Sequence, residues 1–213
     1  MDRLEDQQAL DASLDRLVQK DARLAPYLER CQPIPLRRQP AGLFGLLQII
    51  LAQQVSVASA RAIWSKFNQR FGACGSALLA TASDEDLRTC SLSRPKMKTV
   101  RQIALALEEG FDLERLGTCD VDEARRLLMS LHGVGGWTAD IYLLFCLGKA
   151  DIFPAGDLAL QVAVAKVLEL DDRPAEKKLA HMAEMNWAPE RGAAAHLFWA
   201  IYRDMKAGRE GVL

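Results

Sequence analysis

Residues 131–157 read LHGVGGWTADIYLLFCLGKADIFPAGD, a glycine-containing turn followed by a long apolar segment. The segment before the turn opens with a capping pattern, Asp120 with Glu123 three residues later, which is typical of a helix start. The segment after the turn, Trp137–Leu147, has the length and apolar content of a buried helix. We therefore predict a helical hairpin, with its turn and flanking residues at 129–139.

The glycines of this hairpin suggest a binding role. Gly133 and Gly135 let the backbone turn tightly and approach another molecule closely. The amides at the start of the next helix, from Gly136 to Thr138, would point outward at its positive dipole end and suit a phosphodiester. An αα-turn that binds nothing fits the glycines alone about equally well. A Rossmann loop does not fit, because the preceding segment is helical and the third glycine is absent.

Helical periodicity dominates the rest of the chain. Leucines between Leu4 and Leu28 predict one amphipathic helix over about 3–30, and prolines 33, 35 and 40 mark a connector. That connector would allow the N-terminal helix to pack with the C-terminal ones. Further helices are expected at about 43–51, 57–71, 83–91, 95–109, 158–168, 174–185 and 189–206. With weak strand signals, we predict an all-α protein of eight to eleven helices.

Composition narrows the class of protein. The 213 residues are 50% hydrophobic and 26% charged, with a formal net charge of −1, so we expect a packed core. This near-neutral net charge does not favour binding of nucleic acid by bulk electrostatics. Lys96, Lys98 and Arg101 nevertheless form a local basic cluster. The cluster is either a solvated helix face or a phosphate contact. We find neither an 18-residue apolar run nor a secretory h-region, and expect an intracellular, cytoplasmic protein without a membrane partner.

The cysteines and histidines give little support for a transition-metal site. The five cysteines are widely spaced and never form CxxC, and the three histidines form no HExxH pair. We therefore expect reduced thiols and neither a structural zinc nor an iron–sulfur cluster.

Several motifs in one order resemble the HhH-GPD superfamily of DNA glycosylases, in particular its AlkA-like 3-methyladenine branch. They are LAQQVSVASA (51–60), LSRPKMKTVRQIA (92–104), the hairpin, FPAGDLAL (153–160) and WAPERGAAAHLFWAIY (187–202). The resemblance implies two helical lobes with a cleft between them. It implies one glycosylase unit over 1–213, with residues 1–40 as N-terminal helix and connector in place of an extra α/β domain.

The resemblance assigns catalysis to Asp157. From the residues alone, Asp157 is an N-cap, since it follows Gly156 and precedes an apolar helix, and both roles are compatible. A carboxylate near the sugar can stabilise an oxocarbenium-like transition state and orient water. An alkylated purine already carries positive charge, so it can leave without a strong acid.

Trp137 stands where the lyase branch of the superfamily carries a lysine. An indole cannot form a Schiff base, so we expect a monofunctional enzyme without lyase activity. The resemblance places Trp137 and Trp199 in the base pocket, where electron-rich rings would stack on a cationic base. Core packing is the alternative for both.

Two further assignments follow from the resemblance. Gln53 and Gln54 fall in the loop that enters the DNA minor groove as a wedge, although a polar interruption ending a helix is the alternative. Backbone carbonyls of Met129, Leu131 and Val134 would hold a monovalent cation, Na⁺ or K⁺, with no organic cofactor. His132 is expected to be an exposed turn residue.

The sequence thus predicts a base-excision repair glycosylase. Its partner would be double-stranded DNA with damaged bases, with no obligate protein partner. Its substrates would be alkylated purines of the 3-methyladenine and 7-methylguanine type. The alternatives are a non-catalytic helix-hairpin-helix DNA-binding module and a glycosylase of this fold for a mismatched or deaminated base.

Overall fold

The computed structural model describes residues 3–210, and these residues form helices joined by short connections. Within this part of the chain there is no strand, only an isolated bridge between Arg3 and Lys149. No helix in the described range is long and apolar enough to cross a membrane. The chain divides into two compact units, one made of residues 39–142 and the other of residues 3–38 and 143–210. The all-α prediction is confirmed.

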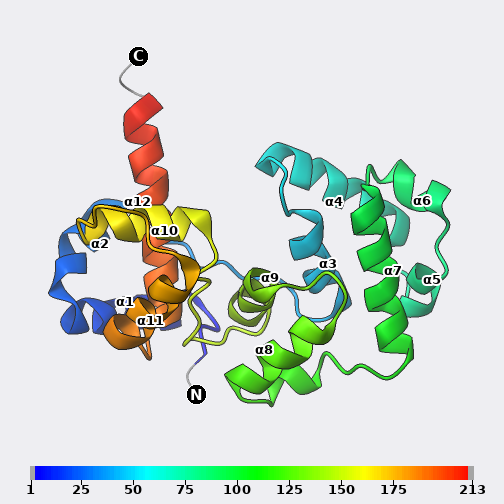
Figure 1. Ribbon diagram of the computed structural model, residues 1–213, viewed down its shortest axis with the longest axis horizontal. Helices are drawn as coiled ribbons and strands as arrows, with labels where there is room; N and C mark the ends of the chain where they lie inside the picture. The colour runs from blue at the N-terminus through cyan, green and yellow to red at the C-terminus, as the bar shows by residue number, and fades with distance from the viewer. Residues whose placement is uncertain (1–2, 211–213) are drawn as a thin grey trace. The chain divides into compact units, whose positions relative to one another are not determined.

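The unit of residues 39–142 is contiguous in sequence and carries the predicted hairpin (Figure 1). Its elements are α3 (Leu43–Leu51), α4 (Val57–Phe71), α5 (Ser76–Ala80), α6 (Asp84–Thr89), α7 (Arg94–Glu108), the 3₁₀ turn η2 (Arg115–Gly117), α8 (Val121–Ser130) and α9 (Gly136–Ile141). Helix α7 packs against α3, α5 and α6, and α9 packs against α3 and α8. The short α5 was not predicted.

Local capping explains several helix starts in this unit. The side chains of Ser56, Ser83 and Asp120 accept hydrogen bonds from backbone amides three residues later, at the starts of α4, α6 and α8. Ser, Thr and Asp are preferred there because they satisfy amides that have no partner within the helix. In a full capping box, the Glu123 side chain would also bond to the backbone amide of Asp120. Here the Glu123 carboxylate accepts a hydrogen bond from Arg115 at 2.9 Å instead, so only half of the predicted box is formed.

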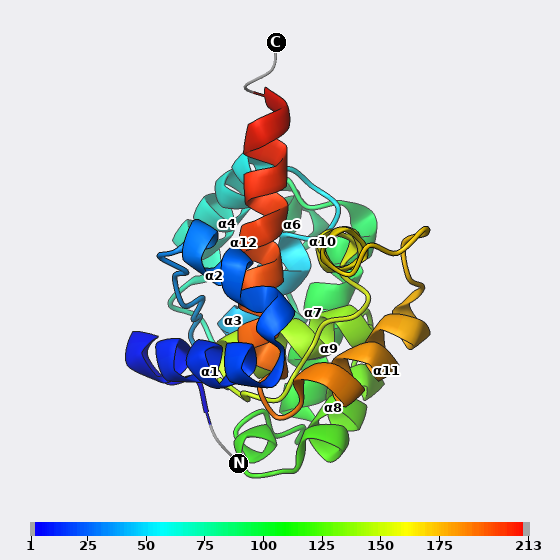
Figure 2. The ribbon, with the colours of Figure 1, turned by 90° about the vertical axis from the view of Figure 1, so that its left-hand side faces the viewer.

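The other unit combines both parts of the chain that flank residues 39–142. It contains α1 (Gln7–Lys20), the 3₁₀ turn η1 (Ala22–Leu24), α2 (Ala25–Cys31), α10 (Leu158–Val167), α11 (Glu176–Trp187) and α12 (Arg191–Glu210). Helices α1, α2, α10 and α11 all pack against α12, shown in orange to red in Figure 2. The N-terminal segment therefore packs with the C-terminal helices, as the sequence allowed.

The single helix predicted over 3–30 is wrong. Helix α1 ends at Lys20, and Asp21 leaves the helical conformation before η1 and α2 begin. Buried Asp21 accepts hydrogen bonds from the side chain of Arg23 and from the Trp187 indole at 3.0 Å. The break depends on a partner 166 residues away, which local periodicity does not reveal.

The prediction of one continuous helix over 137–147 is also only partly correct. Helix α9 ends at Ile141, and the π-helical turn η3 (Tyr142–Cys146) follows it. π-Helical turns widen the backbone spiral by one residue, so they shift which side chains share a face. Tyr142 lies at this turn, and its hydroxyl accepts a hydrogen bond from the Gly42 amide at 2.9 Å.

Candidate active site and DNA-binding hairpin

Five residues join α8 to α9, and the first four of them, 131–134, form a β-turn. The Val134 amide donates to the Leu131 carbonyl at 3.1 Å, and Gly133, the third residue of the turn, has φ of 79°. This is the pattern of a type II turn, which needs a left-handed residue at that position. His132 is exposed, as predicted.

The two glycines of the hairpin, Gly133 and Gly135, have different structural surroundings. A Cβ atom built on Gly133 would lie 2.4 Å from Oγ1 of Thr99 on α7, so this glycine is required by conformation and by close packing. Gly135 has φ of −91°, and a Cβ atom there would meet nothing within 4 Å. Gly135 therefore leaves open space beside the start of α9, where the predicted anion site lies.

A partly buried ion pair braces the hairpin. The Arg125 side chain on α8 donates to the Asp140 carboxylate on α9 at 2.7 Å, and the Asp140 side chain is 10% exposed. The pair resists separation because the Asp140 carboxylate alone would be a poorly solvated charge. Nothing in the sequence pattern singled out this pair, although its 15-residue spacing spans the two hairpin helices.

The predicted wedge loop lies between α3 and α4. Gln54 is exposed at its tip with φ of 56°. Val55 and Val57 beside it are 37% and 71% exposed, so this loop presents apolar surface that the sequence reasoning did not assign.

Contacts within the unit hold the wedge loop in place. The Gln53 amide group donates to the Thr138 hydroxyl at 2.6 Å, which joins the loop to the start of α9. Thr138 is buried, so a phosphate contact at this position would come from its backbone amide. Lys96 donates to the carbonyls of Leu51 and Gln53 at 2.8 and 2.9 Å and so caps the end of α3.

The local basic cluster is largely internal. Besides Lys96, the Arg101 guanidinium is bound to the Ala82 carbonyl at 2.8 Å and to Asp84. Of the three cations, Lys98 alone is exposed, and the other two are half-buried. The charges of Lys96 and Arg101 are engaged within the protein, and the phosphate contact of this cluster stays a prediction.

Asp157 begins α10 in the unit of residues 3–38 and 143–210. Its Oδ1 accepts hydrogen bonds from the amides of Ala159 and Leu160 at 2.9 and 3.2 Å. Its own amide donates to the Pro154 carbonyl at 2.8 Å, which closes the turn before the helix. The side chain is partly exposed, so the carboxylate is fixed in direction and accessible.

Trp199 lies in the same unit as Asp157 but is 6% exposed. Its ring packs against Phe145 and His196 at centroid distances of 5.4 and 5.9 Å, and the Arg37 guanidinium lies over it at 5.0 Å. Trp137 is half-buried at the start of α9, in the other unit.

His196 is a buried structural residue beside this cluster. Its Nδ1 lies 2.8 Å from the Gly192 carbonyl, and its Nε2 accepts the Arg37 backbone amide at 3.3 Å. Burial lowers the pKa of His196 to about 4, so the ring is neutral at physiological pH. Both ring nitrogens are then satisfied, with Nδ1 as the donor.

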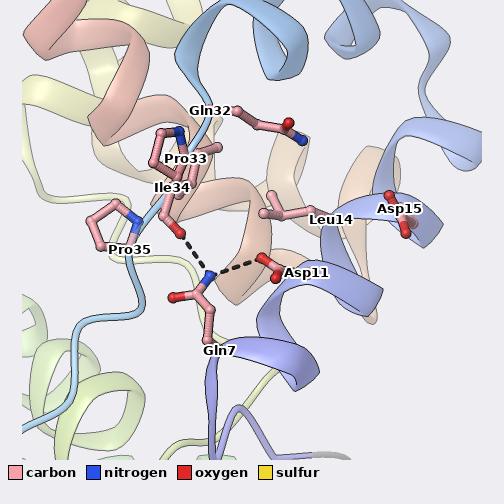
Figure 3. A pocket seen from close by; sticks show the side chains of 8 residues that line it. All are labelled: Gln7, Asp11, Leu14, Asp15, Gln32, Pro33, Ile34 and Pro35. Carbon is pink, nitrogen blue, oxygen red and sulfur yellow. Dashed lines mark hydrogen bonds between the residues drawn. The ribbon is translucent and has the colours of Figure 1, made fainter.

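A cavity of about 700 Å³ lies elsewhere in this unit, between α1 and the segment after α2 (Figure 3). The Gln7 amide group bridges Asp11 and the Ile34 carbonyl at its edge, at 2.8 and 2.9 Å. None of the predicted site residues lines it. Its border carries Asp11 and Asp15, and these carboxylates would repel a phosphate backbone.

The carbonyls proposed for a monovalent cation are backbone oxygens of the hairpin, the donor type that hard cations accept. The Leu131 carbonyl already receives the Val134 amide, so a cation would use its second lone pair. Among the side chains that the structure describes, residues 3–207, no group of three or more His, Cys, Asp or Glu is arranged to hold a metal ion.

Comparison with known proteins places these features in a family. Residues 47–189 match the family model of the HhH-GPD superfamily base excision DNA repair proteins. A DNA-3-methyladenine glycosylase of Schizosaccharomyces pombe is 27% identical over 164 residues, which cover 72% of this chain and 69% of the relative. The match spans only 56% and 32% of the length of two other curated relatives, from Bacillus subtilis and Mycobacterium tuberculosis.

Solved structures agree on the fold. The DNA-3-methyladenine glycosidase of Bacillus halodurans superposes with a TM-score of 0.79 at 25% identity, covering 97% of this chain and 94% of that protein. The S. pombe 3-methyladenine DNA glycosylase, solved with abasic DNA, gives a TM-score of 0.80 at 22% identity, covering 92% and 97%. The family match spans more than half of the residues, including the hairpin and Asp157, and the chain belongs to the HhH-GPD superfamily of base excision DNA repair proteins.

Proposed function

We propose that this chain is a monofunctional DNA glycosylase that removes alkylated purines from duplex DNA. The observation that carries the proposal is Asp157, a partly exposed carboxylate held by two helix amides at the start of α10. Relatives with the same fold bear the name of 3-methyladenine DNA glycosylases, which supports this substrate class.

The reaction needs little beyond this carboxylate. As the bond from C1′ to the base nitrogen breaks, positive charge develops on the sugar, and an anion beside it stabilises the transition state more than the ground state. Water then attacks C1′, and a cationic alkylated purine departs as a neutral base. Trp137 would stack on the flipped base, and the amides at Gly136 and Thr138 would hold a phosphate.

The direct test is base release from methylated duplex DNA by wild type, Asp157→Asn and Asp120→Asn. Asp120 is a matched control because its carboxylate also caps a helix, α8, with Oδ1 2.8 Å from the Glu123 amide. Asparagine caps helices about as well as aspartate, so both variants should remain folded. We expect Asp157→Asn alone to lose release of methylated purines, by at least about 100-fold, the typical effect of removing one electrostatic stabiliser.

Equal release by wild type and Asp157→Asn would show that another residue carries the reaction. DNA binding without release by the wild type would favour the non-catalytic hairpin module. The monofunctional assignment has its own assay, since a lyase forms a Schiff base that borohydride traps on DNA. We expect no trapped product, because Trp137 stands where the lyase branch of the superfamily has a lysine. A trapped product would contradict the assignment as a monofunctional enzyme.

A further inference from the structure

The cavity between α1 and the segment after α2 has no part in the proposed glycosylase chemistry. It lies wholly within the unit of residues 3–38 and 143–210. Its volume of about 700 Å³ falls within the range of about 300–1,000 Å³ that is usual for small-molecule sites. Carboxylates and amides line it together with aliphatic side chains, a mixture that fits a ligand with both charged and apolar parts.

One wall of the cavity is acidic. Asp11 and Asp15 are both exposed and lie one turn apart on α1 (Figure 3). Residues at this spacing share a helix face, with their Cβ atoms about 5–6 Å apart. Among the described residues that line the cavity, none is a lysine, an arginine or a histidine. The cavity is therefore complementary in charge to a ligand that carries two positive charges.

Both carboxylates have capacity for a ligand. The Asp11 carboxylate accepts one hydrogen bond, from the neutral Gln7 amide group at 2.8 Å. An ionised carboxylate can accept about four, so Asp11 has room for further donors. For Asp15, we find neither a side-chain hydrogen bond nor an ion pair within the part of the chain that the structure describes. A bound cation would thus meet two carboxylates that no internal cation neutralises.

The opposite wall, residues 32–35, is largely apolar and held in place. Its two prolines line the cavity together with Ile34 and with Leu14 of α1, which are each 3% exposed. The Gln7 amide group fixes this wall, because it donates to the Ile34 carbonyl at 2.9 Å and accepts from the Leu36 amide at 2.8 Å. Methylene chains lie favourably along such aliphatic surface while their charged ends reach polar groups.

We propose that this cavity binds a linear aliphatic diamine. One ammonium group contacts Asp11, the other contacts Asp15, and the methylene chain lies against the apolar wall. A single exposed ion pair contributes little to binding. Linking two ammonium groups makes the second contact intramolecular, so a diamine binds more tightly than two separate amines. A chain of four methylene groups, as in 1,4-diaminobutane, suits carboxylates one helical turn apart.

This site would add a second binding function to the protein. It takes a small organic cation, whereas the proposed contacts with DNA take phosphate. None of the proposed catalytic or DNA-binding residues lines the cavity, so diamine binding and base release are separate properties. The diamine assay can therefore fail without affecting the glycosylase proposal, and the reverse also holds.

The test is isothermal titration calorimetry of the full chain with 1,4-diaminobutane. We expect saturable binding, with a Kd at least about tenfold lower than that of n-butylamine, which has one ammonium group. Asp11→Asn and Asp15→Asn should each raise the Kd for the diamine by at least about tenfold, because each leaves only one carboxylate in the cavity. Base release from methylated duplex DNA should stay at the wild-type rate in both variants.

Asp171→Asn and Asp172→Asn are the matched controls. Each removes one negative charge from an exposed position of the same unit that does not line the cavity. Exposed charges at a distance are screened at physiological ionic strength, so these variants should change the Kd for the diamine by less than about twofold.

Three results would overturn the proposal. The first is the absence of saturable diamine binding by the wild type. The second is equal weakening by the cavity variants and the controls, which would indicate attraction to net charge alone. The third is equal affinity for 1,4-diaminobutane and for Nα-acetyl-lysine amide, which has one ammonium group on a similar chain. That result would identify a cavity for a single ammonium group, such as the lysine of a partner protein.

Discussion

At the scale of single residues, the chemistry of this protein depends on how each charge is held. Asp157 is directed by two backbone amides, whereas Lys96 and Arg101 are engaged with carbonyls and a carboxylate inside their unit. Residue type alone therefore does not show whether a charge is open to a ligand or engaged within the protein. His196 shows the same point, because burial among aromatic rings makes it a neutral hydrogen-bond bridge.

The buried His196 should make stability depend on pH. Its pKa is about 4 in the folded protein and about 6.5 when unfolded, so the unfolded state binds more protons between these values. Stability should therefore fall as the pH decreases from about 6.5 to about 4, by up to about 3 kcal/mol, with no further loss from this residue below pH 4.

Urea unfolding between pH 4 and 7 measures this effect. His196→Gln should flatten the pH dependence in that window, whatever its own stability, because glutamine does not titrate. His181→Gln, which removes an exposed histidine, should keep the wild-type slope. If His196→Gln and wild type have the same slope, another group accounts for the acid sensitivity.

At the scale of elements, the two glycines of the hairpin differ in what surrounds them, and only one of them is fixed by packing. Gly133 meets Thr99 of α7 and adopts a positive φ, so the turn is fitted to its own unit. Gly135 faces open space beside the start of α9. The wedge loop is linked to the same helix start through Gln53 and Thr138, so two proposed DNA contacts share one support.

Alanine substitutions should separate these roles. Gly133→Ala should destabilise the protein by about 2–4 kcal/mol, the sum of a left-handed alanine and an overpacked contact with Thr99. Gly135→Ala should leave stability within about 0.5 kcal/mol but weaken DNA binding, because its new methyl group occupies the approach to the α9 amides.

Denaturant unfolding and DNA titration of both variants provide the comparison. Unchanged DNA affinity in a folded Gly135→Ala variant would argue that the phosphate does not approach this part of the hairpin. A fully stable Gly133→Ala variant would contradict the turn geometry described above.

At the scale of the whole molecule, the unit of residues 3–38 and 143–210 depends on contacts between distant parts of the chain. Glu190 precedes α12 and is buried; it accepts hydrogen bonds from Ser13 and, at 2.5 Å, from Arg16, both on α1. The Trp187 indole makes a second such link to Asp21. These bonds join segments more than 160 residues apart, so this unit requires both parts of the chain.

Removing the Glu190 charge should loosen this unit. Glu190→Gln leaves Arg16 without its carboxylate partner and weakens the Ser13 bond, and we expect a loss of about 1–3 kcal/mol, since Arg16 is half-exposed and partly solvated. Glu184→Gln on the exposed surface of α11 is the matched control and should change stability by less than about 0.5 kcal/mol. Equal melting temperatures of the two variants would show that the contact between Glu190 and α1 does not contribute to stability.

Much of the fold was predictable because helix formation is largely local. The bounds of α3, α4 and α10, the cap residues Ser83 and Asp120, and the hairpin all follow from periodicity and capping over a few residues. The order of motifs also indicated the family, which the match over residues 47–189 confirms. The roles of Asp157, Trp137 and the wedge glutamines stay predictions.

Other features depend on residues that are distant in sequence. The break after α1 requires Trp187, the orientation of Lys96 requires the carbonyls that end α3, and the cation over Trp199 requires the segment before α3 to lie against α12. Each contact forms only after the helices have packed, and its energy comes from burial and from partners that local propensity does not specify. The amino-acid sequence therefore encodes the helices, the hairpin and the family locally, while packing determines which charges stay exposed and which stabilise the interior.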